Sequence, residues 1–122
     1  MAELVAAWIK VCAMDDLQPN SGVCALVDGQ QIAIFHLVQD NAVYAIGNYD
    51  PIGKANVLSR GVVGDIKGHI VVASPLYKQH FNLQTGDCLE DETVTVPVYP
   101  VRIQDSAVEV QVLAENQQGA AA

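Results

Sequence analysis

The cysteines of this chain are the side chains best suited to redox chemistry or to binding a soft metal ion. They are Cys12, Cys24 and Cys88. Their number is odd and no two of them form a C-x-x-C pair, which is the spacing typical of zinc and thiol–disulfide sites. We interpret them as free, partly buried thiols in a reducing compartment, with a disulfide or a redox pair as the alternative.

Histidines could supply metal ligands or a general base, but they are far apart in the sequence: His36, His69 and His80. We expect ordinary packing or solvation for His36, which lies in an apolar run, and for His69, which lies beside a turn. The sequence contains no G-x-S-x-G elbow, phosphate-binding glycine loop or Cys/His nucleophile pair. The residues therefore give no basis for independent catalysis.

Two proline-containing segments interrupt the apolar pattern and are predicted to form paired loops. They are residues 48–53 (N-Y-D-P-I-G) and residues 74–81 (S-P-L-Y-K-Q-H-F). The net charge is −8, yet Lys54, Arg60 and Lys78 all fall in or near these segments, beside His80. This indicates a local basic patch. The acidic residues at 87 and 90–92 are interpreted as a solvated loop, with a docking surface as the alternative.

The elements that would position these loops are predicted to be short strands, because apolar residues recur mainly with a period of two. The Asp28-Gly29 dipeptide predicts a tight hairpin between residues 23 and 38. Pro97 and Pro100 restrict a later strand to an edge or to irregular pairing. The other predicted strands are 43–47, 66–73 (interrupted early by Lys67-Gly68), 93–96, and 99–103 with 107–112 as a terminal hairpin. One helical turn is expected at residues 14–17, capped by an aspartate.

These elements predict an all-β fold, an antiparallel sandwich or small barrel with little or no helix. A chain of 122 residues with 51% hydrophobic residues can bury one core. We expect a single domain over residues 1–113 and a disordered tail over 114–122, where apolar periodicity ends.

Composition also limits the partners. The apolar runs are shorter than the roughly 20 residues that a membrane-spanning helix needs, and the start of the chain lacks the features of a secretory signal. A net charge of −8 opposes binding to nucleic acid or to anionic lipid. We expect a soluble cytoplasmic protein.

The loops and their surroundings resemble Rieske-type iron-sulfur domains over residues 45–112. The segments that carry the resemblance are Ala45-Ile46, Leu58-Ser59-Arg60-Gly61, Phe81-Asn82-Leu83-Gln84-Thr85-Gly86 and Val98-Tyr99-Pro100-Val101, together with both loops. In that family the first loop carries C-P-H and the second carries C-P-x-H. The two cysteines bind one iron of a 2Fe-2S cluster and the two histidines bind the other.

On this chain the resemblance places Asp50 and Ile52 at the first ligand pair and Ser74 and Tyr77 at the second. Ile52 has no donor atom, and Ser74 offers a hydroxyl where a thiolate is needed. We therefore predict no cluster and no metal ligand. Ile52 and Tyr77 are expected to fill volume that a cluster would occupy. Asp50 is expected to accept backbone N–H groups of its own loop, with metal binding as the alternative.

Among Rieske-like proteins the chain is similar to the small subunits of assimilatory NAD(P)H-dependent nitrite reductases. The shared segments are Asn48-x-Asp50-Pro51, Val57-Leu58-Ser59-Arg60-Gly61, Val72-Ala73-Ser74-Pro75-Leu76 and Cys88-x-Glu90-Asp91-Glu92. The resemblance implies a large subunit that carries FAD, siroheme and an iron-sulfur cluster and reduces nitrite to ammonia. This chain would then be a cofactor-free, non-catalytic subunit.

Two other readings remain open. One is an electron carrier that binds iron through unorthodox ligands, and the other is a general protein-interaction module. For the leading reading we hypothesise that the basic patch docks the large subunit. Its residues are Lys54, Arg60, Tyr77, Lys78 and His80.

Overall fold

The structure, a computed structural model, describes residues 6–38 and 41–113. Within them the strands are β1 (Ala6–Ala13), β2 (Ser21–Val27), β3 (Gln30–Leu37), β4 (Ala42–Gly47), β5 (Tyr49–Asp50), β6 (Ala55–Asn56), β7 (Val62–Ile66), β8 (His69–Ala73), β9 (His80–Asn82), β10 (Val98–Tyr99), β11 (Val101–Gln104) and β12 (Ala107–Leu113). Two single-turn 3-10 helices are η1 (Met14–Asp16) and η2 (Leu58–Arg60). The all-β prediction is confirmed. No helix among the described residues is long and apolar enough to span a membrane. The tail predicted at 114–122 lies outside the described residues.

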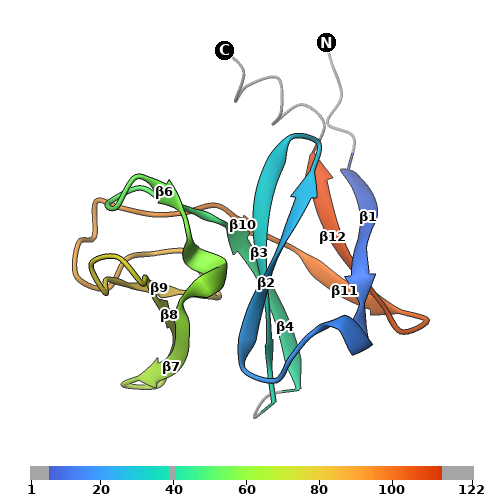
Figure 1. Ribbon diagram of the computed structural model, residues 1–122, viewed down its shortest axis with the longest axis horizontal. Helices are drawn as coiled ribbons and strands as arrows, with labels where there is room; N and C mark the ends of the chain where they lie inside the picture. Colours follow the sequence, from blue (N-terminus) through green and yellow to red (C-terminus); the bar gives the residue numbers. More distant parts are fainter. Residues whose placement is uncertain (1–5, 39–40, 114–122) are drawn as a thin grey trace.

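The larger part of the molecule, at the right in Figure 1, is built from two antiparallel sheets with the strand orders β1-β12-β11 and β10-β4-β3-β2. Pro100 separates β10 from β11, so this stretch of chain passes from one sheet to the other. β11 lies at the edge of its sheet, as predicted, because proline lacks the N–H that a continuous ladder requires.

The predicted hairpins form as the turn residues indicated. Val27 pairs with Gln30, and Asp28 and Gly29 between them have φ values of 50° and 81°. These are the two positive dihedrals of a tight hairpin turn, which glycine and aspartate accept more readily than other residues. The terminal hairpin joins β11 to β12 with Gln104 opposite Ala107.

The smaller part, at the left in Figure 1, contains the β5-β6 pair and the sheet β7-β8-β9. The prediction of one interrupted strand over residues 66–73 is wrong in its geometry. Lys67 and Gly68 have φ values of 52° and 85° and form a turn, so that Ile66 pairs with His69 and two strands result.

The strand predicted at residues 93–96 does not form. Asp91 accepts hydrogen bonds from the Thr93 N–H at 3.0 Å and from the Thr93 hydroxyl at 2.6 Å, which makes this segment a turn. Thr95 forms only an isolated bridge to Asp87. The apolar alternation has another cause, since Val94 and Val96 pack into the core.

The sequence analysis did not predict β1, which pairs with β12 from the opposite end of the chain. η1 follows it at the expected helical turn, and the Asp16 carboxylate accepts the Ala13 N–H at 2.9 Å. β3 then separates two cores. Phe35 packs with Phe81 of the smaller part on one face, and Ile34 packs with Val110 of the other sheet on the opposite face. This shared strand fixes the smaller part, and with it the paired loops, against the larger one.

Candidate functional site: the paired loops

Two loops of the same design face each other in the smaller part of the molecule. Loop 1 (residues 50–54) joins β5 to β6, and loop 2 (residues 74–78) follows β8. In loop 1 the Lys54 N–H donates to the Asp50 carbonyl at 2.6 Å, and in loop 2 the Lys78 N–H donates to the Ser74 carbonyl at 3.0 Å. Each loop is thus a five-residue turn with proline second and lysine fifth. Proline presets φ for this position of a turn.

Asp50 joins the two loops. It is fully buried, and its Oδ1 accepts the backbone N–H groups of Ile52 at 2.8 Å and Gly53 at 3.0 Å. The predicted capture of N–H groups within its own loop is therefore confirmed. Its Oδ2 accepts the Ser74 hydroxyl at 2.5 Å, and Ser74 is only 1% exposed. The residues at the two cysteine positions thus bond directly to each other.

The residues at the two histidine positions behave differently from each other. Ile52 is half-buried and packs against the core. Tyr77 is 66% exposed, so the expectation that it fills volume between the loops is wrong. Leu76 takes that role, because a Cβ placed on Gly53 would lie 2.5 Å from Leu76 Cδ1. The glycine leaves room for loop 2 to pack directly on loop 1.

Asn48 holds loop 1 to the sheet, a role that the sequence analysis did not assign. The side chain is 2% exposed, donates from Nδ2 to Gln31 Oε1 at 3.0 Å, and accepts the Ser59 N–H at 2.7 Å. Its backbone N–H donates to the Gln31 carbonyl, and its carbonyl accepts the Leu58 N–H. The position of this asparagine between a predicted strand and the D-P turn could have indicated this role from the sequence.

The loop chemistry does not fit a Rieske cluster. The ligand positions hold a carboxylate that already accepts three hydrogen bonds, a buried hydroxyl, an alkyl group and an exposed phenol. Soft thiolates and imidazoles, which bind the two irons in that family, are missing from all four positions. Among the residues that the structure describes, no three His, Cys, Asp or Glu side chains form a group able to hold a metal ion.

The structure brings together only some members of the hypothesised docking patch. Lys54, Tyr77 and Lys78 are exposed on the two loops. Arg60 is also exposed, and it precedes β7, whose first residue pairs with Ala73 just before loop 2. His80 is different, because Glu90 engages both its ring Nδ1 at 2.5 Å and its backbone N–H at 2.8 Å. The imidazole is thus turned to the acidic segment of its own chain.

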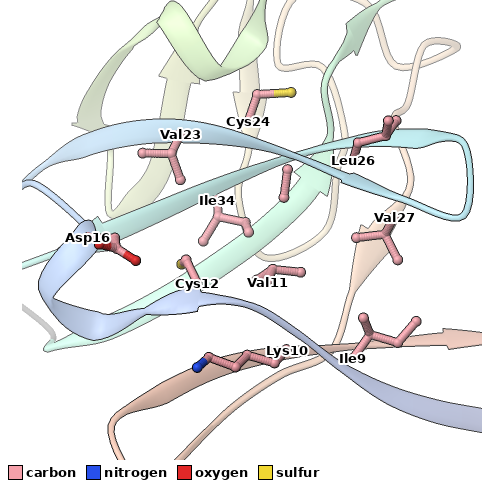
Figure 2. Close-up of a pocket in the computed structure, with 11 residues that line it drawn as sticks. Ile9, Lys10, Val11, Cys12, Asp16, Val23, Cys24, Leu26, Val27 and Ile34 are labelled. Carbon is pink, nitrogen blue, oxygen red and sulfur yellow. The ribbon is translucent and has the colours of Figure 1, made fainter.

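A cavity of about 290 Å³ lies between β1 and β2 at the other side of the molecule (Figure 2). Its walls include Val23, Ile34 and, on the β1 side, Cys12. Burial raises the pKa of the Cys12 thiol, with a further rise from Asp16, so the reactive thiolate is disfavoured. All three cysteines are free, but only Cys12 is partly buried as expected, since Cys24 is exposed and Cys88 is buried. The cavity is a gap between two strands that belong to different sheets.

Comparison with known proteins identifies relatives of the fold and of the paired loops. The sequence model of the Rieske-like 2Fe-2S domain matches residues 7–111. The nitrite reductase (NADH) small subunit of Salmonella typhimurium is 44% identical over 107 residues, which are 88% of this chain and 99% of that protein. A Mycobacterium tuberculosis crystal structure, assigned as an NADH-dependent nitrite reductase small subunit, has a TM-score of 0.86 and 46% identity and covers 90% of this chain and 98% of its own.

A third relative is a much longer protein. The nitrite reductase NAD(P)H large subunit of Klebsiella oxytoca is 37% identical over 101 residues, which are 83% of this chain but only 10% of that protein. This chain thus matches nearly the full length of the small subunits but only a short segment of that large subunit. The chain belongs to the Rieske-like domain family and, within it, to the nitrite reductase (NADH) small subunits.

Proposed function

We propose that this chain is the cofactor-free, non-catalytic small subunit of a cytoplasmic NAD(P)H-dependent nitrite reductase, in which it docks to the large catalytic subunit. The observation that carries the proposal is its 44% identity to a curated small subunit across 99% of that protein's length. The reaction would be the reduction of nitrite to ammonia during nitrate assimilation. FAD, siroheme and an iron-sulfur cluster would reside on the large subunit.

The Klebsiella oxytoca relative supports a large subunit as the partner. A segment similar to this chain occupies about one tenth of that large subunit. A domain that is covalently part of the large subunit in one organism and a separate chain in another is expected to occupy an equivalent place in both complexes. The separate chain must then bind through a non-covalent interface.

The loop chemistry supports a role without electron transfer. An electron carrier needs a redox centre, and the four cluster positions provide neither thiolate nor imidazole. The loops are held to each other by the hydrogen bond from the Ser74 hydroxyl to Asp50 and by the contact of Leu76 with Gly53. We propose that their shape, not a cofactor, is the functional feature.

The test is affinity capture from nitrite-grown cells with the full-length chain as bait. We expect a large polypeptide with the visible absorption of flavin and siroheme to be retained. Retention of unrelated proteins without that polypeptide would favour a general interaction module. Iron analysis and a visible spectrum of the purified chain test the electron-carrier alternative, which requires stoichiometric iron.

A further inference from the structure

The repeated design of the paired loops extends to the conformation of their lysines. Lys54 has a φ of 60° and Lys78 a φ of 64°, so both are in the left-handed region that glycine adopts most easily. Both stand four residues after the buried residue that opens the turn, Asp50 in one loop and Ser74 in the other. The two turns, D-P-I-G-K and S-P-L-Y-K, share only the proline and the lysine, and each presents its ammonium group from the fifth position.

The ammonium groups of the two lysines have no ion-pair partner in the part of the chain that the structure describes. Both side chains are exposed, and within residues 6–38 and 41–113 neither forms an ion pair. The two ion pairs of that part of the chain join His80 to Glu90 and Arg102 to Glu109. The charges of Lys54 and Lys78 are thus available to a partner.

Loop 2 also exposes two apolar side chains. Leu76 is 44% exposed and Tyr77 is 66% exposed, although both belong to a tightly hydrogen-bonded turn. Leu76 also contacts Gly53, the neighbour of Lys54, while Tyr77 precedes Lys78. The exposed surface of the two loops therefore carries two ammonium groups together with an aliphatic and an aromatic side chain. An exposed aromatic and aliphatic centre with charges around it is the usual anatomy of a protein interface.

The charge of this surface is opposite to that of the chain as a whole. The chain has 14 acidic residues against six lysines and arginines, with a net charge of −8. Most of the surface would therefore attract a positively charged partner, whereas the two loops with Lys54 and Lys78 would attract a negatively charged one.

We propose that the loop tip, defined as Lys54, Leu76, Tyr77 and Lys78, docks onto an acidic face of the large subunit, with an apolar pocket that receives Leu76 and Tyr77 between two carboxylate-bearing sites. This inference rests on the proposed function and names its binding surface. Compared with the patch expected from sequence, it omits His80, whose ring is held by Glu90, and Arg60, which lies in η2 outside the two loops, and it adds Leu76.

The experiment measures the dissociation constant between the purified small and large subunits by calorimetry, at low and at high ionic strength. The test variant is Lys54→Glu/Lys78→Glu. Lys67→Glu is the matched control, because Lys67 is exposed and has a φ of 52° but lies at the turn between β7 and β8, away from the loops.

We expect the double variant to bind at least about tenfold more weakly at low ionic strength, with a smaller loss at about 1 M salt, where the Debye length is only about 3 Å. Lys67→Glu should bind as the wild type does. A second variant, Lys54→Gly/Lys78→Gly, removes both charges at backbone positions that suit glycine, so it should keep the fold and also bind more weakly. Leu76→Ser should weaken binding at both salt concentrations.

The outcomes separate the two proposals. If the wild-type chain does not bind the large subunit, the proposed function is wrong. If the wild-type chain binds and both lysine double variants bind as tightly as Lys67→Glu, the subunit assignment stands and the loop tip is not the docking surface.

Discussion

Replacing Ser74 with alanine tests whether the hydrogen bond between the loops holds them together. Ser74 is 1% exposed and its hydroxyl is the donor to Asp50 Oδ2, which lies in a side chain that is fully buried. The substitution leaves this oxygen without its donor while the two N–H donors to Oδ1 remain. A hydrogen bond to a charged group contributes about 1.5–3 kcal/mol, and an unsatisfied buried acceptor adds its desolvation cost.

We therefore expect Ser74→Ala to lower the free energy of unfolding by about 2–3 kcal/mol. For a domain of this size, each kcal/mol corresponds to roughly 3–6 °C in Tm, so the midpoint should fall by about 10 °C. Urea denaturation followed by circular dichroism measures the free energy, and calorimetry measures the midpoint. Ser59→Ala is the matched control, because the Ser59 contact to Asn48 uses its backbone N–H.

A double-mutant cycle assigns the effect to the pair. Asp50→Ala and Ser74→Ala should couple by about 1 kcal/mol or more, because each removes the partner of the other. The reasoning is refuted if Ser74→Ala destabilises the protein no more than Ser59→Ala, or if the two loop substitutions are additive.

Two further predictions concern the rest of the smaller part. Burial opposes ionisation of Glu90, but the hydrogen bonds from the backbone and ring of His80 outweigh it and lower the Glu90 pKa below 4.5. A carboxyl group with a lowered pKa stabilises the fold at pH values above its unfolded-state pKa, and this stabilisation disappears as the pH falls through its folded-state pKa. Glu90→Gln should therefore lower the free energy of unfolding by less than about 1 kcal/mol at pH 7 and should not change it in strong acid. Urea denaturation at the two pH values measures both. Gly86→Ala should destabilise the protein far more than Gly29→Ala in thermal melts: both glycines have φ above 80°, but a Cβ on Gly86 would lie 2.1 Å from the Val96 carbonyl oxygen, whereas none at Gly29 meets an atom within 4 Å. Equal melting points for these two variants would contradict the packing argument.

The elements that sequence could predict are those whose cause is local. The turn at Asp28-Gly29 needs only two residues that accept positive φ, and the strands around it follow from alternation. β1 was missed because its partner β12 is at the far end of the chain and no local pattern announces such a pairing. The strand expected at 93–96 failed because alternation reports the burial of Val94 and Val96, not the presence of a neighbouring strand.

The same distinction applies to the site. Capture of the Ile52 and Gly53 N–H groups by Asp50 is a local interaction, and the D-P sequence indicated it. The Ser74 donor is 24 residues away, and its contact with Asp50 depends on how two sheets place their loops. Tyr77 was expected from its size to fill the volume of a cluster, but the turn directs Leu76 onto Gly53 and leaves Tyr77 exposed.

The hydrogen bond between Asp50 and Ser74 suggests how the two loops stay together without the cluster ligands of other Rieske domains. In a metal-binding domain the bonds to the metal contribute directly to folding, so losing every ligand would free two loops that nothing else joins. Here Asp50 and Ser74 stand at the cysteine positions and bond to each other, while Leu76 closes the contact over Gly53. The buried hydrogen bond between Asp50 and Ser74 carries no electrons, but it forms only when the two loops lie at one particular distance from each other. Lys54 and Lys78 are the residues that close these two turns, so the bond between Ser74 and Asp50 also helps to place the two lysines relative to each other. Loosening that bond should therefore weaken partner binding even in a variant that retains both lysines.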